Sequence, residues 1–212
     1  MVRFITFEGG DGSGKTTQLK VLANYLRTRG RPCLSTREPG GTSLGQHIRQ
    51  VLLEVGTQSI TSPTELFLYL ADRAQHMHEV VIPALEQGKI VVCDRHTDST
   101  LAYQGYGRGL DLGLLRSLND IASQGIKPDL TLLFDCPVEI GLSRTVQRQP
   151  QTVSGRNEDR FEREKIEFHE RVRAGFLELA RAEPNRFRIV DAARSAEEVG
   201  QEIKSIIDGE LT

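Results

Sequence analysis

A glycine-rich segment near the N-terminus constrains the fold of this chain more than any other feature. Residues 9–17 read GGDGSGKTT and fit the pattern G-x-x-x-x-G-K-[ST]. An apolar run at 4–7, typical of a buried strand, precedes them, and a segment with helical periodicity at 17–28 follows. In such a strand–loop–helix, glycines let backbone N–H groups turn towards phosphate oxygens, and the helix N-terminus adds partial positive charge. The sequence therefore predicts a nucleoside triphosphate site.

The side chains of this segment have expected roles. Lys15 would reach the β- and γ-phosphates, and the Thr16 hydroxyl would ligate Mg²⁺. The residues expected to surround the triphosphate are Gly9, Gly10, Asp11, Gly12, Ser13, Gly14, Lys15, Thr16 and Thr17. The motif does not say what becomes of the triphosphate, so that information has to come from the rest of the chain.

Five short apolar runs alternate with longer helical segments along the 212 residues. The runs lie at 4–7, 33–36, 90–93, 130–134 and 187–190, and their nearly continuous hydrophobicity is typical of strands covered on both faces. Helices are predicted at 17–28, 43–54, 63–87, 112–123, 138–147, 159–182 and 193–208. The alternation predicts a doubly wound α/β fold with a five-stranded parallel sheet. No linker is evident, so we expect one domain over residues 1–212.

Charge and cysteine content narrow the class of partner. The 27 Lys and Arg residues nearly balance the 29 Asp and Glu residues, so no overall field favours nucleic acid or an anionic membrane. No signal peptide and no bilayer-spanning apolar run is evident. Cys33, Cys93 and Cys136 fall in or beside the apolar runs and are expected to be buried, reduced thiols. We expect a cytoplasmic protein that binds neither nucleic acid nor membranes.

Polar residues follow the second and third apolar runs, where ligands of an open parallel sheet bind. Arg37, Glu38 and Pro39 follow the second run. Pro39 is rigid and restricts Glu38, so either a plain turn or a pocket wall would explain the segment. Asp94 and Arg95 follow the third run, and the planar guanidinium of Arg95 suits a phosphate. Asp94 would orient Arg95 or hold water on Mg²⁺; a structural ion pair is the alternative.

Tyr69 and Arg73 lie four residues apart on a predicted helix and therefore share a face. An aromatic ring and a guanidinium on one face could stack on and hydrogen-bond a planar base, although a core residue beside a surface residue would give the same pattern. The five histidines have neither metal-site nor triad spacing and are expected to be solvated or at the core edge: His47, His76, His78, His96 and His169.

The segment 147–158 departs from the globular pattern because it is polar and contains Pro150 and Gly155. Four arginines lie within or beside it: Arg144, Arg148, Arg156 and Arg160. A solvated surface loop and a mobile, arginine-bearing flap over a phosphate site would both have this composition.

Taken together, these motifs resemble those of the thymidylate kinases, the family of nucleoside-monophosphate kinases that makes dTDP from dTMP and ATP. The resemblance covers essentially the whole chain, with EGGDGSGKTT at 8–17, REPGGT at 37–42, ADRAQH at 71–76, DRHTDSTLAYQ at 94–104 and DRFE at 159–162. The first motif indicates only the P-loop NTPase superfamily, whereas the second and fourth together are far more specific. The resemblance implies ATP and dTMP as substrates, Mg²⁺ as cofactor and a homodimer.

The resemblance also implies how the acceptor would be held at its phosphate and sugar. Arg37 and Arg95 would bind the acceptor phosphate, with Glu38 nearby. Asp11 would meet the 3′-hydroxyl of the sugar. Tyr103 would crowd the 2′ position and favour deoxyribose.

Another set of residues would surround the base. Tyr69 would stack on thymine where the family commonly has Phe, and Arg73 would hydrogen-bond a thymine carbonyl. Pro39 would approach the 5-methyl group, and Ser99 and Gln104 would lie around the ring.

The source of the catalytic cation distinguishes two branches of the family. One branch carries an arginine inside the phosphate loop, but here residues 11–13 read DGS. The other branch supplies arginines from a mobile lid, which would span about residues 144–160, although Val146 stands where a third lid arginine is usual. Which of Arg148, Arg156 and Arg160 would reach the phosphoryl group stays open. The residues expected to act in catalysis are Lys15, Asp94, Arg95, Arg144 and Arg148.

Two other functions would share the phosphate loop. A kinase acting on another nucleoside monophosphate or on a deoxynucleoside would lack the REPGG and AYQ elements. A nucleotide-dependent switch ATPase would need a water-positioning residue and a partner surface, for which the sequence offers no candidate.

Overall fold

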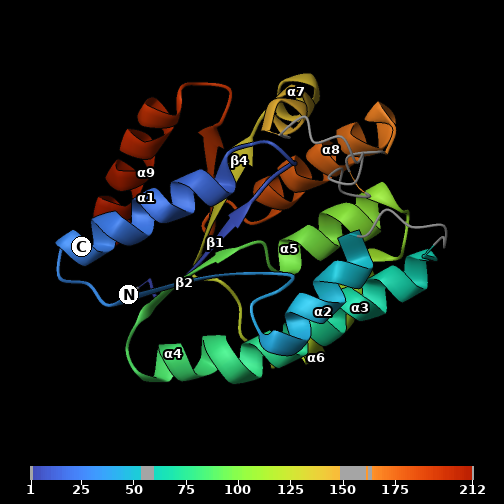
Figure 1. Cartoon of the computed structure of the whole chain (residues 1–212), viewed down its shortest axis with the longest axis horizontal. Coiled ribbons are helices and arrows are strands. Elements are labelled where there is room, and N and C mark those ends of the chain that lie inside the picture. The colour runs from blue at the N-terminus through green and yellow to red at the C-terminus, as the bar shows by residue number, and fades with distance from the viewer. Residues whose placement is uncertain (1, 54–59, 149–160, 162–163, 212) are drawn as a thin grey trace.

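The computed structural model contains one parallel sheet between two layers of helices (Figure 1). It describes residues 2–53, 60–148, 161 and 164–211. The strands are β1 (Phe4–Glu8), β2 (Cys33–Arg37), β3 (Ile90–Asp94), β4 (Leu130–Asp135) and β5 (Phe187–Asp191), in the order β2-β3-β1-β4-β5. All four pairings are parallel. The predicted doubly wound fold with a five-stranded parallel sheet is confirmed.

Each strand continues one residue beyond its predicted end. The added residues are charged: Glu8, Arg37, Asp94, Asp135 and Asp191. They still pair in the backbone ladder, with Arg37 opposite Asp94 and Asp135 opposite Asp191. The apolar run of each strand stops one residue before its backbone pairing does, because the last side chains lie at the open edge of the sheet. The fold thereby collects charged groups along one edge.

Helices cover both faces of the sheet. On one face, α1 (Lys15–Thr28) packs against α9 (Ala196–Glu210), and their apolar residues share a core with Ile5 and Phe7 of β1. On the other face, α3 (Ser62–His76), α6 (Leu112–Ala122) and α8 (Ile166–Ala182) share a core with Leu133 of β4. The remaining helices are α2 (Ser43–Leu53), α4 (Ile82–Glu86), α5 (Thr97–Thr100) and α7 (Val138–Arg148). None of the helices in the described part of the chain is long and apolar enough to cross a bilayer.

Two predicted helices differ from the structure by more than a few residues at their ends. The segment predicted at 63–87 is α3 and α4 joined by a π-helical turn, Met77–Val81. Pro83 follows this turn; in a regular α-helix its ring would clash with the carbonyl of Glu79, and the wider turn avoids this. The helix predicted to begin at 159 begins at Ile166, and residues 159–160 and 162–163 lie outside the described part.

A helical segment that was not predicted follows β3. It consists of α5 and a π-helical stretch, Leu101–Gly107. Glycines at 105 and 107 lower helix propensity, so local sequence does not favour a helix here. Both pack closely against neighbouring side chains, because a Cβ at Gly105 would lie 2.4 Å from Leu112 and one at Gly107 2.7 Å from Phe168. Tertiary packing, and not local sequence, therefore determines the helical conformation of this segment.

The cysteines match the prediction of reduced thiols. Cys93 and Cys136 are buried, Cys33 is half-buried, and all three are free. Burial raises the pKa of the Cys33 thiol to about 11, so this thiol stays protonated and unreactive at neutral pH.

Candidate active site

At two positions of the loop between β1 and α1, the backbone passes so close to a neighbouring carbonyl oxygen that only glycine fits. Gly9 has φ +133°, and a Cβ there would lie 2.4 Å from the carbonyl oxygen of Phe134. Gly12 has φ +71°, and a Cβ there would lie 1.9 Å from the carbonyl oxygen of Gly141. The loop leads directly into α1, whose first residue is Lys15. The loop therefore has tight glycine turns and ends at a helix N-terminus, which is where the predicted phosphate would bind.

Lys15 is buried inside this loop. Its ammonium group donates to the carbonyl oxygens of Gly9 at 3.0 Å and Gly10 at 2.7 Å, and to Ser13 Oγ at 3.1 Å. Burial, followed by the positive charge of Arg95, lowers the pKa of Lys15 to about 8. A bound phosphate would supply the negative charge that favours the protonated amine.

Arg95 lies at the carboxyl end of β3 in the left-handed backbone region, with φ 71°. Its Nη2 donates to Asp11 Oδ1 at 2.6 Å, and its Nη1 donates to the carbonyl oxygen of Gly9 at 2.9 Å and to Ser99 Oγ at 3.2 Å. The Tyr103 hydroxyl donates to Asp11 Oδ2 at 3.1 Å. Burial alone would raise the pKa of Asp11, but Arg95 and Lys15 outweigh it and lower that pKa. The structure thus joins the phosphate loop to the motif after β3.

Glu8 at the end of β1 holds the turn that carries Arg95. It is fully buried; its Oε1 accepts hydrogen bonds from the backbone N–H of His96 at 2.8 Å and of Ser99 at 3.3 Å, and its Oε2 accepts one from Ser99 Oγ at 2.6 Å. Ser99 Oγ in turn accepts from Arg95. Burial, together with the negative charge of Asp98, raises the pKa of Glu8 to about 8. Glu8 therefore supports Arg95 through Ser99.

The replacement Glu8→Gln is expected to change how stability depends on pH. Because the pKa of Glu8 is higher in the folded chain than its value of 4.5 in the unfolded one, the folded chain binds the proton more tightly. The free energy of unfolding of the wild type should therefore fall as the pH rises from about 4.5 to about 8, by about 2–4 kcal/mol relative to the variant. Denaturant unfolding of both proteins at pH 5 and pH 8 measures this difference, and parallel pH profiles would contradict it.

A cavity of about 560 Å³, including its open mouth, lies beside Asp11 and Arg95. Its size is within the range of small-molecule sites. Eight of the ten residues predicted to bind the acceptor line it: Asp11, Pro39, Tyr69, Arg73, Arg95, Ser99, Tyr103 and Gln104. We call this cavity the acceptor pocket.

Arg73 lies in the wall of the acceptor pocket and is almost fully bonded to the protein. Its Nε donates to Glu38 Oε2 at 2.8 Å, its Nη1 to Thr100 Oγ1 at 2.9 Å and Asn119 Oδ1 at 2.6 Å, and its Nη2 to the carbonyl oxygen of His96 at 3.0 Å. Four of its five N–H groups are therefore used by described residues. One N–H, on Nη2, is left for a ligand.

Glu38 lies behind Arg73 and does not line the acceptor pocket. It is buried, and its Oε1 accepts hydrogen bonds from His76 Nδ1 at 2.9 Å and His96 Nδ1 at 3.0 Å. Burial would raise the pKa of Glu38, but His96 and Arg73 hold it well below its usual range. Glu38, His76 and Cys93 lie close enough to share a metal ion, but both oxygens of Glu38 are already occupied, so this group does not fit one.

The family model described as thymidylate kinase matches residues 7–203. The chain belongs to the thymidylate kinase family. The thymidylate kinase of Desulfovibrio desulfuricans is 53% identical over 208 residues, which cover 98% of this chain and 96% of that protein. That of Carboxydothermus hydrogenoformans is also 53% identical over 208 residues, covering 98% and 97%.

A solved structure of the family has the same fold. The crystal structure of thymidylate kinase from Ehrlichia chaffeensis matches with a TM-score of 0.77 at 35% identity, and the match covers 98% of each chain. The topology described above is thus shared along nearly the full length of both chains.

Arg37 does not lie where the thymidylate kinase resemblance led us to expect. It is exposed at the end of β2 and is not among the residues that line the acceptor pocket. Arg49 of α2 lines the pocket instead, with its Nη1 donating to the carbonyl oxygen of Pro39 at 3.0 Å. Arg49 stands in no motif, so sequence reasoning missed it.

The histidine expectation is wrong for three of the five residues. His76 and His96 are fully buried, and His169 is 6% exposed. The first two are buried because each donates to Glu38. His47 and His78 are exposed, as expected.

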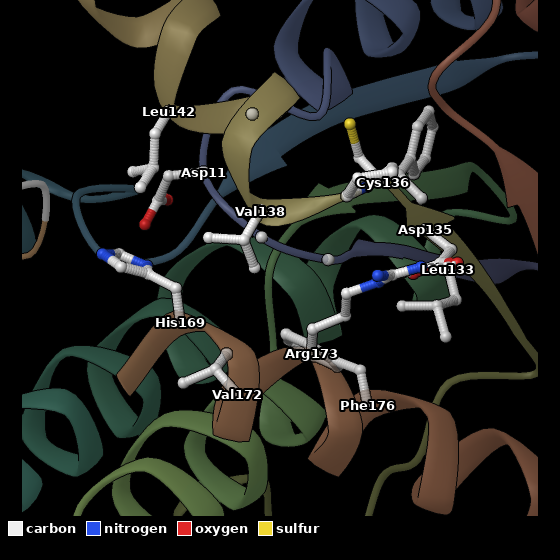
Figure 2. Close-up of a pocket in the computed structure, with 15 residues that line it drawn as sticks. Asp11, Leu133, Asp135, Cys136, Val138, Leu142, His169, Val172, Arg173 and Phe176 are labelled. Carbon is white, nitrogen blue, oxygen red and sulfur yellow. Dashed lines mark hydrogen bonds and ion pairs between the residues drawn. The ribbon is translucent and has the colours of Figure 1, made fainter. Parts of the chain in front are cut away.

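A smaller cavity lies between the phosphate loop, the turn after β4 and α8 (Figure 2). At one end, Arg173 of α8 binds Asp135 at the end of β4 through two hydrogen bonds of 2.6 and 2.9 Å. At the other, His169 of α8 faces Asp11 of the loop, and its Nε2 is buried without a partner among the described residues. The helix that follows the expected lid therefore adjoins the phosphate loop.

The expected lid lies mostly outside the described part of the chain. Arg144 of α7 donates to the carbonyl oxygens of Ala192 at 2.7 Å and Ala193 at 3.1 Å, beside a hollow that Gly12, Ser13 and Thr17 also line. The side chain of Arg148 and all of Arg156 and Arg160 lie outside the described residues. The lid at 144–160 and the choice of its catalytic arginine stay predictions.

Proposed function

We infer that this protein phosphorylates dTMP to dTDP with ATP as the phosphoryl donor. Its membership of the thymidylate kinase family supports this. The observation that carries the inference is that the phosphate loop and the acceptor pocket share a residue. Asp11 belongs to the loop and also lines the pocket, where Arg95 binds it. A donor in the loop and an acceptor in the pocket would bring their phosphates together at this point.

A panel of acceptors tests the inference. With ATP and Mg²⁺, we expect dTMP to be phosphorylated much faster than AMP, GMP or thymidine. Equal rates with AMP or GMP would favour another nucleoside-monophosphate kinase. Rapid ATP hydrolysis without an acceptor, unaffected by dTMP, would favour a switch ATPase.

Phosphoryl transfer here needs no general base. A phosphate oxygen of dTMP, already anionic at pH 7, attacks the γ-phosphorus of ATP, and the bond to the β-phosphate oxygen breaks with its electron pair left on ADP. Catalysis then depends on alignment and on neutralising charge around a loose, in-line transition state. Lys15 would neutralise charge on the donor, and Arg95 would align the acceptor.

We propose that Mg²⁺ binds at the mouth of the phosphate loop. The Thr16 hydroxyl donates to Asp94 Oδ2 at 2.8 Å, so two hard oxygen ligands, one from the start of α1 and one from the end of β3, already lie together there. Such oxygens fit Mg²⁺, which keeps several waters and takes few protein ligands. Thr16 would bind the ion directly and Asp94 through a water. The ion, when bound, reduces the negative charge of the donor phosphates.

We propose that the protein forms a homodimer through α2, α3 and α6. These helices pack side by side, with α3 contacting the other two. Large apolar side chains on them are exposed: Val51 by 52%, Phe67 by 62%, Leu114 by 55% and Ile121 by 74%. A surface of this kind indicates a protein interface. Sedimentation at micromolar concentration should give twice the chain mass of 23.6 kDa, and a monomer would overturn the proposal.

We propose a cytoplasmic location for this activity. The three free thiols fit a reducing compartment, and none of them is paired in a disulfide. Fractionation of cells followed by detection of the protein tests this, and recovery in a secreted fraction would contradict it.

A further inference from the structure

Glu65 of α3 is a buried carboxylate next to the acceptor pocket. It is 1% exposed. Its Oε1 accepts a hydrogen bond from Gln104 Nε2 at 2.8 Å, and Arg108 Nη2 lies 3.2 Å from its Oε2. Arg108 is fixed in turn by Glu164 at 2.6 Å and by the ring of Phe168, 4.5 Å away. Glu65 is therefore held rigidly against the side chain of Gln104.

This contact determines which way the Gln104 amide points. The two ends of a primary amide have nearly the same shape, but one donates hydrogen bonds and the other accepts them. A carboxylate paired with an arginine only accepts, so the end of Gln104 that faces Glu65 must be its NH₂ group. The carbonyl oxygen, Oε1, then points the other way. No donor from the described residues bonds it, and Gln104 lines the acceptor pocket.

Gln104 and Arg73 together consequently offer a base one acceptor and one donor. The acceptor is Oε1 of Gln104, and the donor is the remaining N–H of Arg73. A pyrimidine with an N–H at position 3 and an oxygen at position 4 has the matching pattern. A 4-aminopyrimidine has the opposite pattern, with an acceptor at position 3 and a donor at position 4.

We propose that Glu65 is the positioning residue that makes the acceptor pocket select 4-oxo over 4-amino pyrimidines, acting through the orientation of Gln104. The proposal rests on the proposed binding of dTMP in this pocket. An amide that was free to rotate would present its NH₂ group to a 4-aminopyrimidine and remove half of the mismatch. Fixing the amide keeps that mismatch in place, where unpaired buried polar groups cost about 10–100-fold in binding each.

The variant Glu65→Gln tests this with dTMP and 5-methyl-dCMP as competing acceptors. The two nucleotides have the same methyl group, sugar and phosphate and differ only at positions 3 and 4 of the ring. A glutamine at position 65 can donate or accept, so the amide of Gln104 is free to turn over. We expect the ratio of kcat/KM for dTMP to that for 5-methyl-dCMP to fall at least tenfold, through a lower KM for 5-methyl-dCMP, with the KM for ATP unchanged. A ratio within twofold of the wild type overturns the proposal.

Glu164→Gln is the matched control. It makes the same chemical change in the other carboxylate bound to Arg108, but among the described residues the Gln104 amide donates to Glu65 and not to Glu164. Its selectivity ratio is expected to equal that of the wild type. An equal fall in both variants would assign the effect to Arg108 and overturn the role of Glu65.

The double variant separates an effect through Gln104 from a general loss of structure. Gln104→Ala alone must lower the ratio while leaving the Glu65–Arg108 pair intact, and Glu65→Gln in that background must lower it no further. A further fall in the double variant, or an unchanged ratio in Gln104→Ala, overturns the proposal. An unchanged ratio in Gln104→Ala overturns the proposal even if the Glu65→Gln variant does not fold. Turnover of dTMP by the wild type is measured first, because its absence would contradict the proposed function and not this inference.

Discussion

Replacing Arg95 by alanine is expected to lower kcat/KM for dTMP by about 10³-fold, since both alignment of the acceptor and charge at the reacting group are lost. The guanidinium lies between the phosphate loop and the acceptor pocket, held by Asp11, the Gly9 carbonyl and Ser99. Its planar guanidinium can donate hydrogen bonds to two phosphate oxygens at once. Steady-state kinetics with dTMP varied at saturating ATP measure the effect, and binding of an ATP analogue should stay within a few-fold of the wild type.

The variant Arg95→Lys is the control that keeps the positive charge but removes the planar guanidinium. Lysine presents its charge at a single point, so we expect Arg95→Lys to restore activity only in part. Its kcat/KM for dTMP should stay about 10–100-fold below that of the wild type. Full activity in Arg95→Lys would show that charge alone is needed at this position. Full activity in Arg95→Ala would exclude Arg95 from acceptor binding.

Replacing Arg148 by alanine is expected to lower kcat by about 10³–10⁵-fold, the range for an arginine that stabilises a transferring phosphoryl group. The phosphate loop reads Asp11-Gly12-Ser13 and carries no arginine, so the cation has to come from another segment. Arg148 ends α7, the helix that leads into the expected lid. Single-turnover quench measurements with prebound ATP and dTMP isolate the chemical step, and the KM values should change much less than kcat.

Arg144→Ala is the matched comparison one helical turn away. Its guanidinium is bound to the carbonyl oxygens of Ala192 and Ala193, beside the phosphate loop. We therefore expect its loss to weaken ATP binding more than it lowers kcat. If Arg148→Ala were near wild type, the catalytic role would pass to Arg156 or Arg160, and equal kcat losses in both variants would contradict the distinction drawn here.

The sequence by itself determined the features that depend on short-range pattern. The phosphate loop was predictable because its glycines, Lys15 and Thr16 act within one strand–loop–helix unit. The parallel sheet was predictable because buried strands alternate with helices. The residues after β3 were predictable as a site because parallel strands deliver their carboxyl ends to one edge. Motif resemblance then predicted ten acceptor-binding residues, and eight of them line one cavity, the acceptor pocket.

Only the tertiary structure decided which buried polar groups support those residues. Arg73 is oriented by Glu38 and Asn119, which lie 35 and 46 positions away in the sequence, and Gln104 is oriented by Glu65, 39 positions away. It also placed Arg49, and not Arg37, in the acceptor pocket. No local pattern encodes such pairs, because a buried polar side chain takes its partner from whichever element the fold packs against it. Motif reading therefore identified residues that line the acceptor pocket, and the packing of α3, α6 and the helix after β3 determined how those residues are oriented.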